Sequence, residues 1–181
     1  TYDIPKPSFG SLLNTLLSRW SLDTNFHVQS APPVDLVADF IFSPVDGSFI
    51  NVRPNVNPGV SWYVNDPTVP GGRRINSAAF SMPTPGQSGN FGRNQVRGLP
   101  AWQVDFAIRR EFRLREKLKM QFRAEAFNIF NHPNFGTIQT FLGTPNFGQA
   151  TDILSQQLGG LNQLYQIGGP RSFQFAVKLV F

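Results

Sequence analysis

Alternation of apolar and polar residues is the most regular pattern in the chain, and it occurs in four segments. They cover residues 20–29, 102–111, 118–126 and 172–181. A period of two predicts β-strands with one apolar and one polar face. Each segment has about the 9 to 11 residues that a tilted transmembrane strand needs.

The connections between these segments are very unequal in length. Residues 113–116 form a tight turn between the second and third segments, whereas residues 30–101 and 131–171 form long connections. Soluble sandwiches also alternate, but short periplasmic turns opposite long extracellular loops are typical of outer-membrane barrels. We therefore predict an all-β fold, with antiparallel strands from the C-terminal part of a transmembrane β-barrel and long extracellular loops. Residues 30–101 have room for a further hairpin.

In a barrel of this kind the polar faces line the lumen. The charged and titratable residues on those faces are Asp23, His27, Asp105, Arg109, Glu111, Lys119, Arg123, Glu125 and Lys178. One hairpin register sets Glu111 opposite Lys119, another sets Asp105 opposite Arg123, and the sequence does not choose between them. Arg110 is the one charge on the apolar faces, and we expect its long side chain to snorkel to water near a strand end.

Composition narrows the possible functions. A net charge of +5 raises nucleic acid as a partner, but the 16 Lys and Arg residues are scattered, so we expect no nucleic-acid binding. No apolar run approaches the roughly 20 residues of a membrane helix, so any span is made of strands. With no cysteine and only two histidines, metal and nucleophile sites have few candidate residues. We predict no enzyme activity, no catalytic residues, no metal and no cofactor.

The long connections repeat a small element built on Asn, Phe and Gly. Pro133-Asn134-Phe135-Gly136 recurs as Pro145-Asn146-Phe147-Gly148, and Gly89-Asn90-Phe91-Gly92 is similar. The pattern predicts turns that carry a hydrophobic plug, and the alternative is an aromatic that contacts ligand. A short helix is predicted over residues 151–158 with Thr151 as N-cap, and residues 12–17 allow a helical turn.

Two motifs resemble a known family. Residues 89–94 followed by Arg97-Gly98, and then residues 121–136, resemble the C-terminal region of Oar-like TonB-dependent receptors, as do Gly169-Pro170-Arg171 and the Phe-terminated last strand. The resemblance implies a barrel of about 22 strands with a plugged lumen. It also implies that the whole chain, residues 1–181, is a C-terminal fragment without the plug, which fits a chain that begins at Thr1. Four strands alone cannot close a barrel, since the smallest natural barrels use about eight.

The resemblance also implies a location and partners. The location is the bacterial outer membrane, and the partners are outer-membrane lipid, an unknown ligand, and the TonB complex reached through the missing N-terminal part. Phe181 matches a terminal aromatic that the barrel-assembly machinery recognises, with companions at Phe173, Phe175, Val177 and Leu179. We therefore expect a receptor for TonB-dependent ligand uptake. The alternatives are a passive porin-like channel and a secreted β-sandwich that binds glycans.

Overall fold

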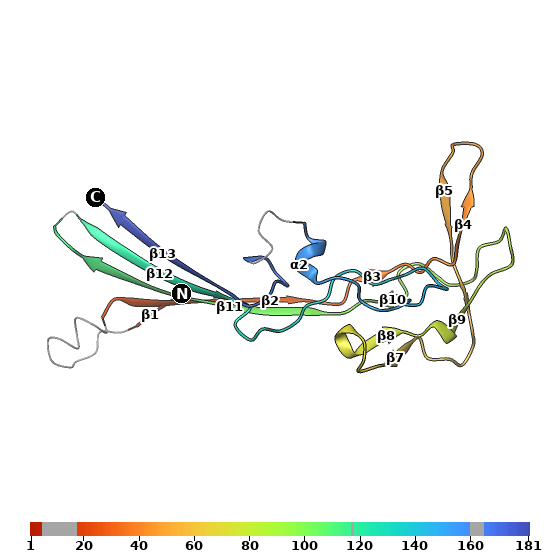
Figure 1. Cartoon of the computed structure of the whole chain (residues 1–181), viewed down its shortest axis with the longest axis horizontal. Coiled ribbons are helices and arrows are strands. Elements are labelled where there is room, and N and C mark those ends of the chain that lie inside the picture. The colour runs from red at the N-terminus through yellow and green to blue at the C-terminus, as the bar shows by residue number, and fades with distance from the viewer. Residues whose placement is uncertain (5–17, 117, 160–164) are drawn as a thin grey trace. The chain divides into compact units, whose positions relative to one another are not determined.

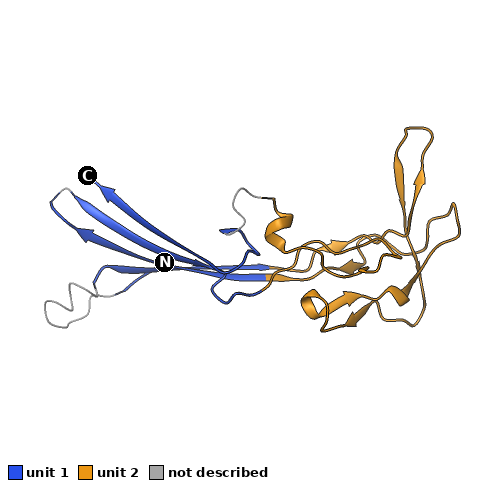
Figure 2. Cartoon of the chain, in the orientation of Figure 1, with its two compact units in different colours: residues 1–28, 102–132, 160–181 blue, residues 29–101, 133–159 orange. Residues whose placement is uncertain are grey.

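The computed structural model describes residues 1–4, 18–116, 118–159 and 165–181. The chain divides into two compact units, shown in blue and orange in Figure 2. Unit 1 comprises residues 1–28, 102–132 and 160–181, and unit 2 comprises residues 29–101 and 133–159. The strands pair antiparallel, which confirms the all-β prediction.

Unit 1 is built on a five-stranded sheet. Its strands are β1 (Tyr2–Asp3), β2 (Trp20–Gln29), β11 (Ala101–Arg113), β12 (Lys119–Phe127) and β13 (Ser172–Val180), in the order β1-β2-β11-β12-β13. Figure 1 shows β11, β12 and β13 side by side. All four predicted strands are present, and β2 has the predicted bounds. The two-residue β1 was not predicted, since so short a strand has no periodicity.

The register of the β11–β12 hairpin corrects both registers inferred from the sequence. Glu111 pairs with Gln121, and Arg109 pairs with Arg123. The physical reason is that β11 continues to Arg113, and the hairpin closes where the N–H groups of Leu114 and Arg115 donate to the Leu118 carbonyl. Because the observed register differs from the predicted ones by even numbers of residues, the faces stay as predicted.

The apolar faces of β12 and β13 coincide. Phe173, Phe175, Val177 and Leu179 pair with Ala126, Ala124, Phe122 and Met120 respectively. The rings of Phe122 and Phe175 stack with centroids 6.5 Å apart. Residues directly opposite each other share a face, so the polar positions of these two strands meet on the other side of the sheet.

Arg110 does not extend to water as expected. Its side chain is only 7% exposed, and its guanidinium lies 4.3 Å from the Phe112 ring centroid and 5.2 Å from the Trp20 ring centroid. An aromatic face attracts a cation electrostatically. The rings of Trp20 and Phe112 therefore contact the guanidinium that we expected to lie in water.

Unit 2 consists of the two long connections, which fold together around their own core. Its strands pair as β3 (Pro33–Val34) with β10 (Val96–Arg97), β4 (Asp39–Phe42) with β5 (Phe49–Val52), β6 (Asn55–Val56) with β9 (Phe80–Ser81), and β7 (Tyr63–Asn65) with β8 (Arg73–Ile75). Two 3₁₀ turns, η1 (Pro70–Gly72) and η2 (Ser77–Ala79), lie between these strands. The β4–β5 hairpin confirms that residues 30–101 contain a further hairpin, and it is labelled in Figure 1.

The core of unit 2 is apolar and drawn from both segments. Its buried members are Leu36, Ala38, Ile75, Ala79, Phe80, Phe91, Val96, Ile138, Leu142, Phe147 and Ala150. Burial of this many apolar side chains gives unit 2 a hydrophobic driving force of its own. The two segments therefore form a folded body and are not extended loops.

The Asn-Phe-Gly elements supply part of that core, as the plug interpretation predicts. Phe91 and Phe147 are 1% and 3% exposed, and Phe135 packs against the same cluster. Gly148 follows Phe147 with φ of 76°, and a Cβ there would lie 2.3 Å from the Ile75 carbonyl oxygen. Only glycine fits this position without strain, because the position requires a left-handed backbone and has no room for a side chain.

Helical structure is smaller than predicted. Helix α2 covers Leu154–Gln157, and its N-cap is Ile153 and not Thr151. Thr151 instead pairs with residue 137, because both its N–H and its hydroxyl donate to the Thr137 carbonyl. The helical turn predicted over residues 12–17 lies outside the described residues. Among the residues described, no helix is both long and apolar enough to cross a membrane.

Candidate functional site

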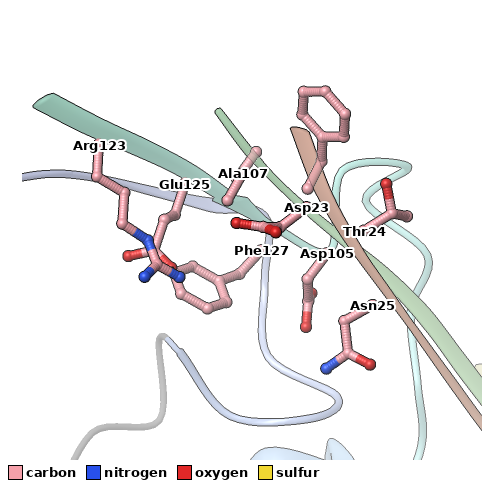
Figure 3. A pocket seen from close by; sticks show the side chains of 10 residues that line it. Asp23, Thr24, Asn25, Asp105, Ala107, Arg123, Glu125 and Phe127 are labelled. Carbon is pink, nitrogen blue, oxygen red and sulfur yellow. The ribbon is translucent and has the colours of Figure 1, made fainter. Parts of the chain in front are cut away.

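The polar face of the unit 1 sheet contains a pocket of about 170 Å³. Three strands supply its charged residues: Asp23 comes from β2, Asp105 from β11, and Arg123 and Glu125 from β12. In Figure 3, Arg123 and Glu125 point toward one another beside the two aspartates. The alternation of each strand places these side chains on one face, and strand order brings them together.

Two polar side-chain contacts connect β2 to β11. Asp23 Oδ2 lies 3.3 Å from Arg109 Nε, and His27 Nε2 lies 3.3 Å from Asp105 Oδ2. Moving four residues along β2 corresponds to moving four residues backwards along β11, as an antiparallel pair requires. Asp23 also accepts a hydrogen bond from the Thr1 hydroxyl.

Two further pairs involve β12. Arg123 Nη2 donates to Glu125 Oε1 at 2.7 Å, within one strand face. Lys119 Nζ lies 3.5 Å from Glu111 Oε1. The predicted partnership of Lys119 with Glu111 therefore exists, but as a diagonal contact, because Glu111 pairs directly with Gln121.

Asp105 makes three contacts on the polar face. Its Oδ1 accepts from Gln103 Nε2 at 2.7 Å and from the Asn128 N–H at 2.9 Å, while Oδ2 faces His27. Gln103 is 1% exposed, and its Oε1 accepts from the Gly168 N–H at 2.8 Å. Asp105 and Gln103 of β11 thus bind three other segments of unit 1, at His27, Asn128 and Gly168.

Asn128 continues this network beyond the end of β12. Its Nδ2 donates to the carbonyls of His132 and Gly169 at 2.9 and 2.8 Å, and its Oδ1 accepts from the His132 N–H. No sequence pattern predicts a role for Gln103 or Asn128. Gln103 gave a signal, because it alternates with Asp105 on the polar face, but the long-range partner of Asn128 at Gly169 leaves no trace in a local pattern.

The structure does not bring every predicted residue into the pocket. Lys178 of β13 lies opposite Gln121 of β12. The apolar residues of β13 lie on the other face of the sheet; they are Phe173, Phe175, Val177 and Leu179. Phe181, which directly follows β13, is 91% exposed.

The charge of the polar face is balanced. The predicted set has four carboxylates and four Lys or Arg side chains, with His27 beside Asp105. Opposite charges interspersed in this way produce no strong field of one sign. Within the described residues, no three His, Asp or Glu side chains are grouped so that they could hold a metal ion.

The comparisons with known proteins identify the class of barrel. The family described as outer membrane beta barrel domain matches residues 1–174. The chain belongs to this family, and its location is the bacterial outer membrane. No curated protein and no solved structure matches the chain. Because the protein is located in the outer membrane, the alternative of a secreted β-sandwich is wrong.

Proposed function

We propose that the chain is part of a TonB-dependent receptor that takes up a ligand across the outer membrane. The observation that carries the proposal is unit 2, because two long connections fold into one body with its own apolar core. A folded body presents a fixed surface to a ligand, whereas extended loops would lose conformational entropy on binding. The resemblance to Oar-like receptors in residues 89–98 and 121–136 supports the same function.

In this function the polar face of unit 1 lines the lumen. Its paired charges are stable beside water and avoid the cost of charge facing lipid. The contacts of Asp23 with Arg109 and of His27 with Asp105 also join β2 to β11 in register. The energy for transport comes from the TonB complex, which contacts the part of the receptor that precedes this chain.

A passive channel is the second candidate, and the balanced charge of the polar face favours it. Such a surface is wet and does not reject either sign of ion strongly. The two candidates differ in energy coupling and in conductance, so both can be measured on one preparation of the full-length protein.

The test combines cross-linking with electrical recording. The full-length protein is cross-linked in its native outer membrane, and a TonB adduct is sought by mass spectrometry. The purified protein is then placed in a planar bilayer. A receptor gives the adduct and no steady conductance, because its lumen is plugged. Steady conductance without an adduct would reject the receptor and establish the channel.

The same proposal assigns no catalytic activity and no cofactor to the protein. A sustained turnover of a bound ligand by the purified full-length protein would contradict it. The partners are outer-membrane lipid, the ligand, the TonB complex and, during insertion, the barrel-assembly machinery acting at β13.

A further inference from the structure

Unit 2 contains a pocket of about 90 Å³ with two arginines in its wall. It is lined by Asp35, Leu36, Val37, Asn51, Arg53 and Arg93. A site needs only about 10–15 Å³ to hold one water, so the pocket has room for a small polar group.

Backbone hydrogen bonds fix the segments that carry the two arginines. The Gly89 N–H donates to the Arg53 carbonyl at 2.8 Å, and the Phe91 N–H donates to the Pro54 carbonyl at 3.1 Å. Asp35 Oδ1 accepts from the Asn94 N–H at 2.8 Å, which holds the turn that contains Arg93. Leu36 and Phe91 anchor these segments in the core at 2% and 1% exposure. The wall of the pocket is therefore part of the folded body of unit 2.

The charges of unit 2 single out this pocket. All residues of unit 2 are described, and three of its five arginines have partners. Arg73 donates to the Gly98 carbonyl, Arg74 pairs with Asp66, and Arg97 donates to the Ala31 carbonyl. Neither Arg53 nor Arg93 makes an ion pair or a side-chain hydrogen bond with any residue that the structure describes.

Arg53 and Arg93 thus line one pocket, where an anion would be attracted to both positive charges. The pocket has one carboxylate, Asp35, whose Oδ1 accepts from the Asn94 N–H. One carboxylate offsets one of the two guanidinium charges, so the lining keeps a net positive charge. A guanidinium binds carboxylate and phosphate through parallel N–H donors, and two guanidiniums offer several such donors. The Asn51 side chain adds an uncharged polar group to the same wall.

We propose that this pocket binds an anionic oxygen group, a carboxylate or a phosphate, of the ligand that the receptor takes up. The inference rests on the proposed function, because it assigns a chemical class to the ligand of the proposed receptor. The same chemistry is offered by a free solute and by an anionic lipid headgroup, so the test separates the two sources.

The experiment uses the full-length protein in nanodiscs of uncharged lipid, titrated with inorganic phosphate and with acetate at constant ionic strength. Binding is followed in every variant by the backbone amide signals of Asn51 and Asn94, which lie at the pocket. In the wild type it is also followed by the NMR signals of the arginine Nε–H groups, which are assigned with the single variants Arg53→Gln and Arg93→Gln. We expect saturable shifts at Arg53 and Arg93, and an apparent Kd that rises about tenfold or more in the double variant. The double variant Arg74→Gln/Arg97→Gln removes the same charge from unit 2 and is expected to leave the Kd unchanged.

A second preparation in nanodiscs with anionic lipid identifies the source. If anionic headgroups occupy the pocket, they weaken phosphate binding in the wild type, and this competition disappears in the Arg53→Gln/Arg93→Gln variant. If they do not, phosphate binds equally in both lipids, and the site takes a solute. The proposal is overturned if neither anion shifts the two signals, or if both double variants lose binding alike. The anion titration does not depend on energised uptake. A negative titration therefore does not contradict the TonB cross-linking test, and a missing TonB adduct does not contradict anion binding.

Discussion

Asn128 shows how one side chain can hold the end of a strand hairpin together. It adopts φ of 49°, a left-handed conformation that asparagine tolerates better than most residues. At 2% exposure its amide satisfies two carbonyls and one N–H that water does not reach easily. A buried polar group that loses its partner costs free energy, so these contacts are linked energetically.

We expect Asn128→Ala to lower the free energy of local opening around residues 128–132 by about 3 kcal/mol, since several buried polar groups lose a partner. Hydrogen exchange of the full-length protein, read at those amides, measures the change. Asn131→Ala is the matched control, because Asn131 has φ of 50° and its side-chain Oδ1 accepts a hydrogen bond from the Arg171 N–H. It should cost about 1 kcal/mol. Equal losses in the two variants would mean that the backbone conformation matters and the buried amide does not.

Asp66 illustrates a residue-scale effect in unit 2 that depends on pH. Its carboxylate accepts from the Thr68 hydroxyl and N–H, and pairs with Arg74 at 3.4 Å. The Thr68 hydroxyl is the main reason that the pKa of Asp66 lies below its ordinary value of 3.8. Because the folded pKa is lowered, the ionised carboxylate stabilises the turn above that value, and the contribution disappears as pH falls through the folded pKa.

We expect Thr68→Val to raise the pKa of Asp66 toward 3.8, since the largest cause of its lowering is removed. An NMR titration of the labelled aspartate carboxyl carbons measures this shift. Asp46 is the internal control, because its lowered pKa depends on hydrogen bonds from Ser43 and Ser48. An unmoved Asp66 in the Thr68→Val protein, or a shift of both aspartates, would contradict the assignment.

At the scale of elements, the alternation of residues carries most of the information about unit 1. It defines β2 to the residue and keeps Asp23, Asp105 and Arg123 on one face. It does not define the register, because all registers that differ by two residues preserve the faces. The turn decides among them, and the hydrogen bonds of Leu114 and Arg115 to Leu118 depend on backbone geometry that the sequence of the turn does not specify.

Disulfide trapping tests the β11–β12 register directly, and the chain has no native cysteine to interfere. Glu111→Cys combined with Gln121→Cys places two thiols directly opposite each other. Glu111→Cys combined with Lys119→Cys places them diagonally, at roughly 7–8 Å, beyond the usual Cα separation of a disulfide. We expect rapid oxidation of the first pair and slow oxidation of the second, as counted by free-thiol labelling. Faster closure of the second pair would restore the register inferred from the sequence.

Strand β13 pairs with β12 and presents exposed apolar residues on one face. If Phe181 completes the signal that the assembly machinery reads, deleting it from the full-length protein lowers the outer-membrane level several-fold. Membrane fractionation with quantitative immunoblotting measures this. The control is Leu158→Ala, which shortens an exposed apolar side chain of unit 2 and should leave insertion unchanged. Normal insertion without Phe181 would remove the assembly role from β13.

At the scale of the whole molecule, the sequence indicated barrel strands but not the second folded unit. Strands of two to four residues, such as β6 and β9, carry no readable period. Their pairing joins residues that lie far apart in the chain, as Val56 with Phe80. Phe91 and Phe147 were recognisable as plugs because Asn and Gly flank them, yet nothing local indicates that both enter one core. The same limit hid the Arg53–Arg93 pocket, which three separate segments form.

The predicted orientation of the barrel can be tested, because residues that face opposite sides of the membrane differ in their access to reagents. Val45 is 93% exposed in the turn between β4 and β5, and Arg115 lies in the short turn between β11 and β12. If the long connections are extracellular, a membrane-impermeant maleimide labels Val45→Cys in intact cells of the native host and labels Arg115→Cys only after the outer membrane is permeabilised. Denatured samples of both variants provide the full-labelling reference. The reverse pattern would place unit 2 in the periplasm, where it could not meet an external ligand, and would leave the anion pocket without access to the medium.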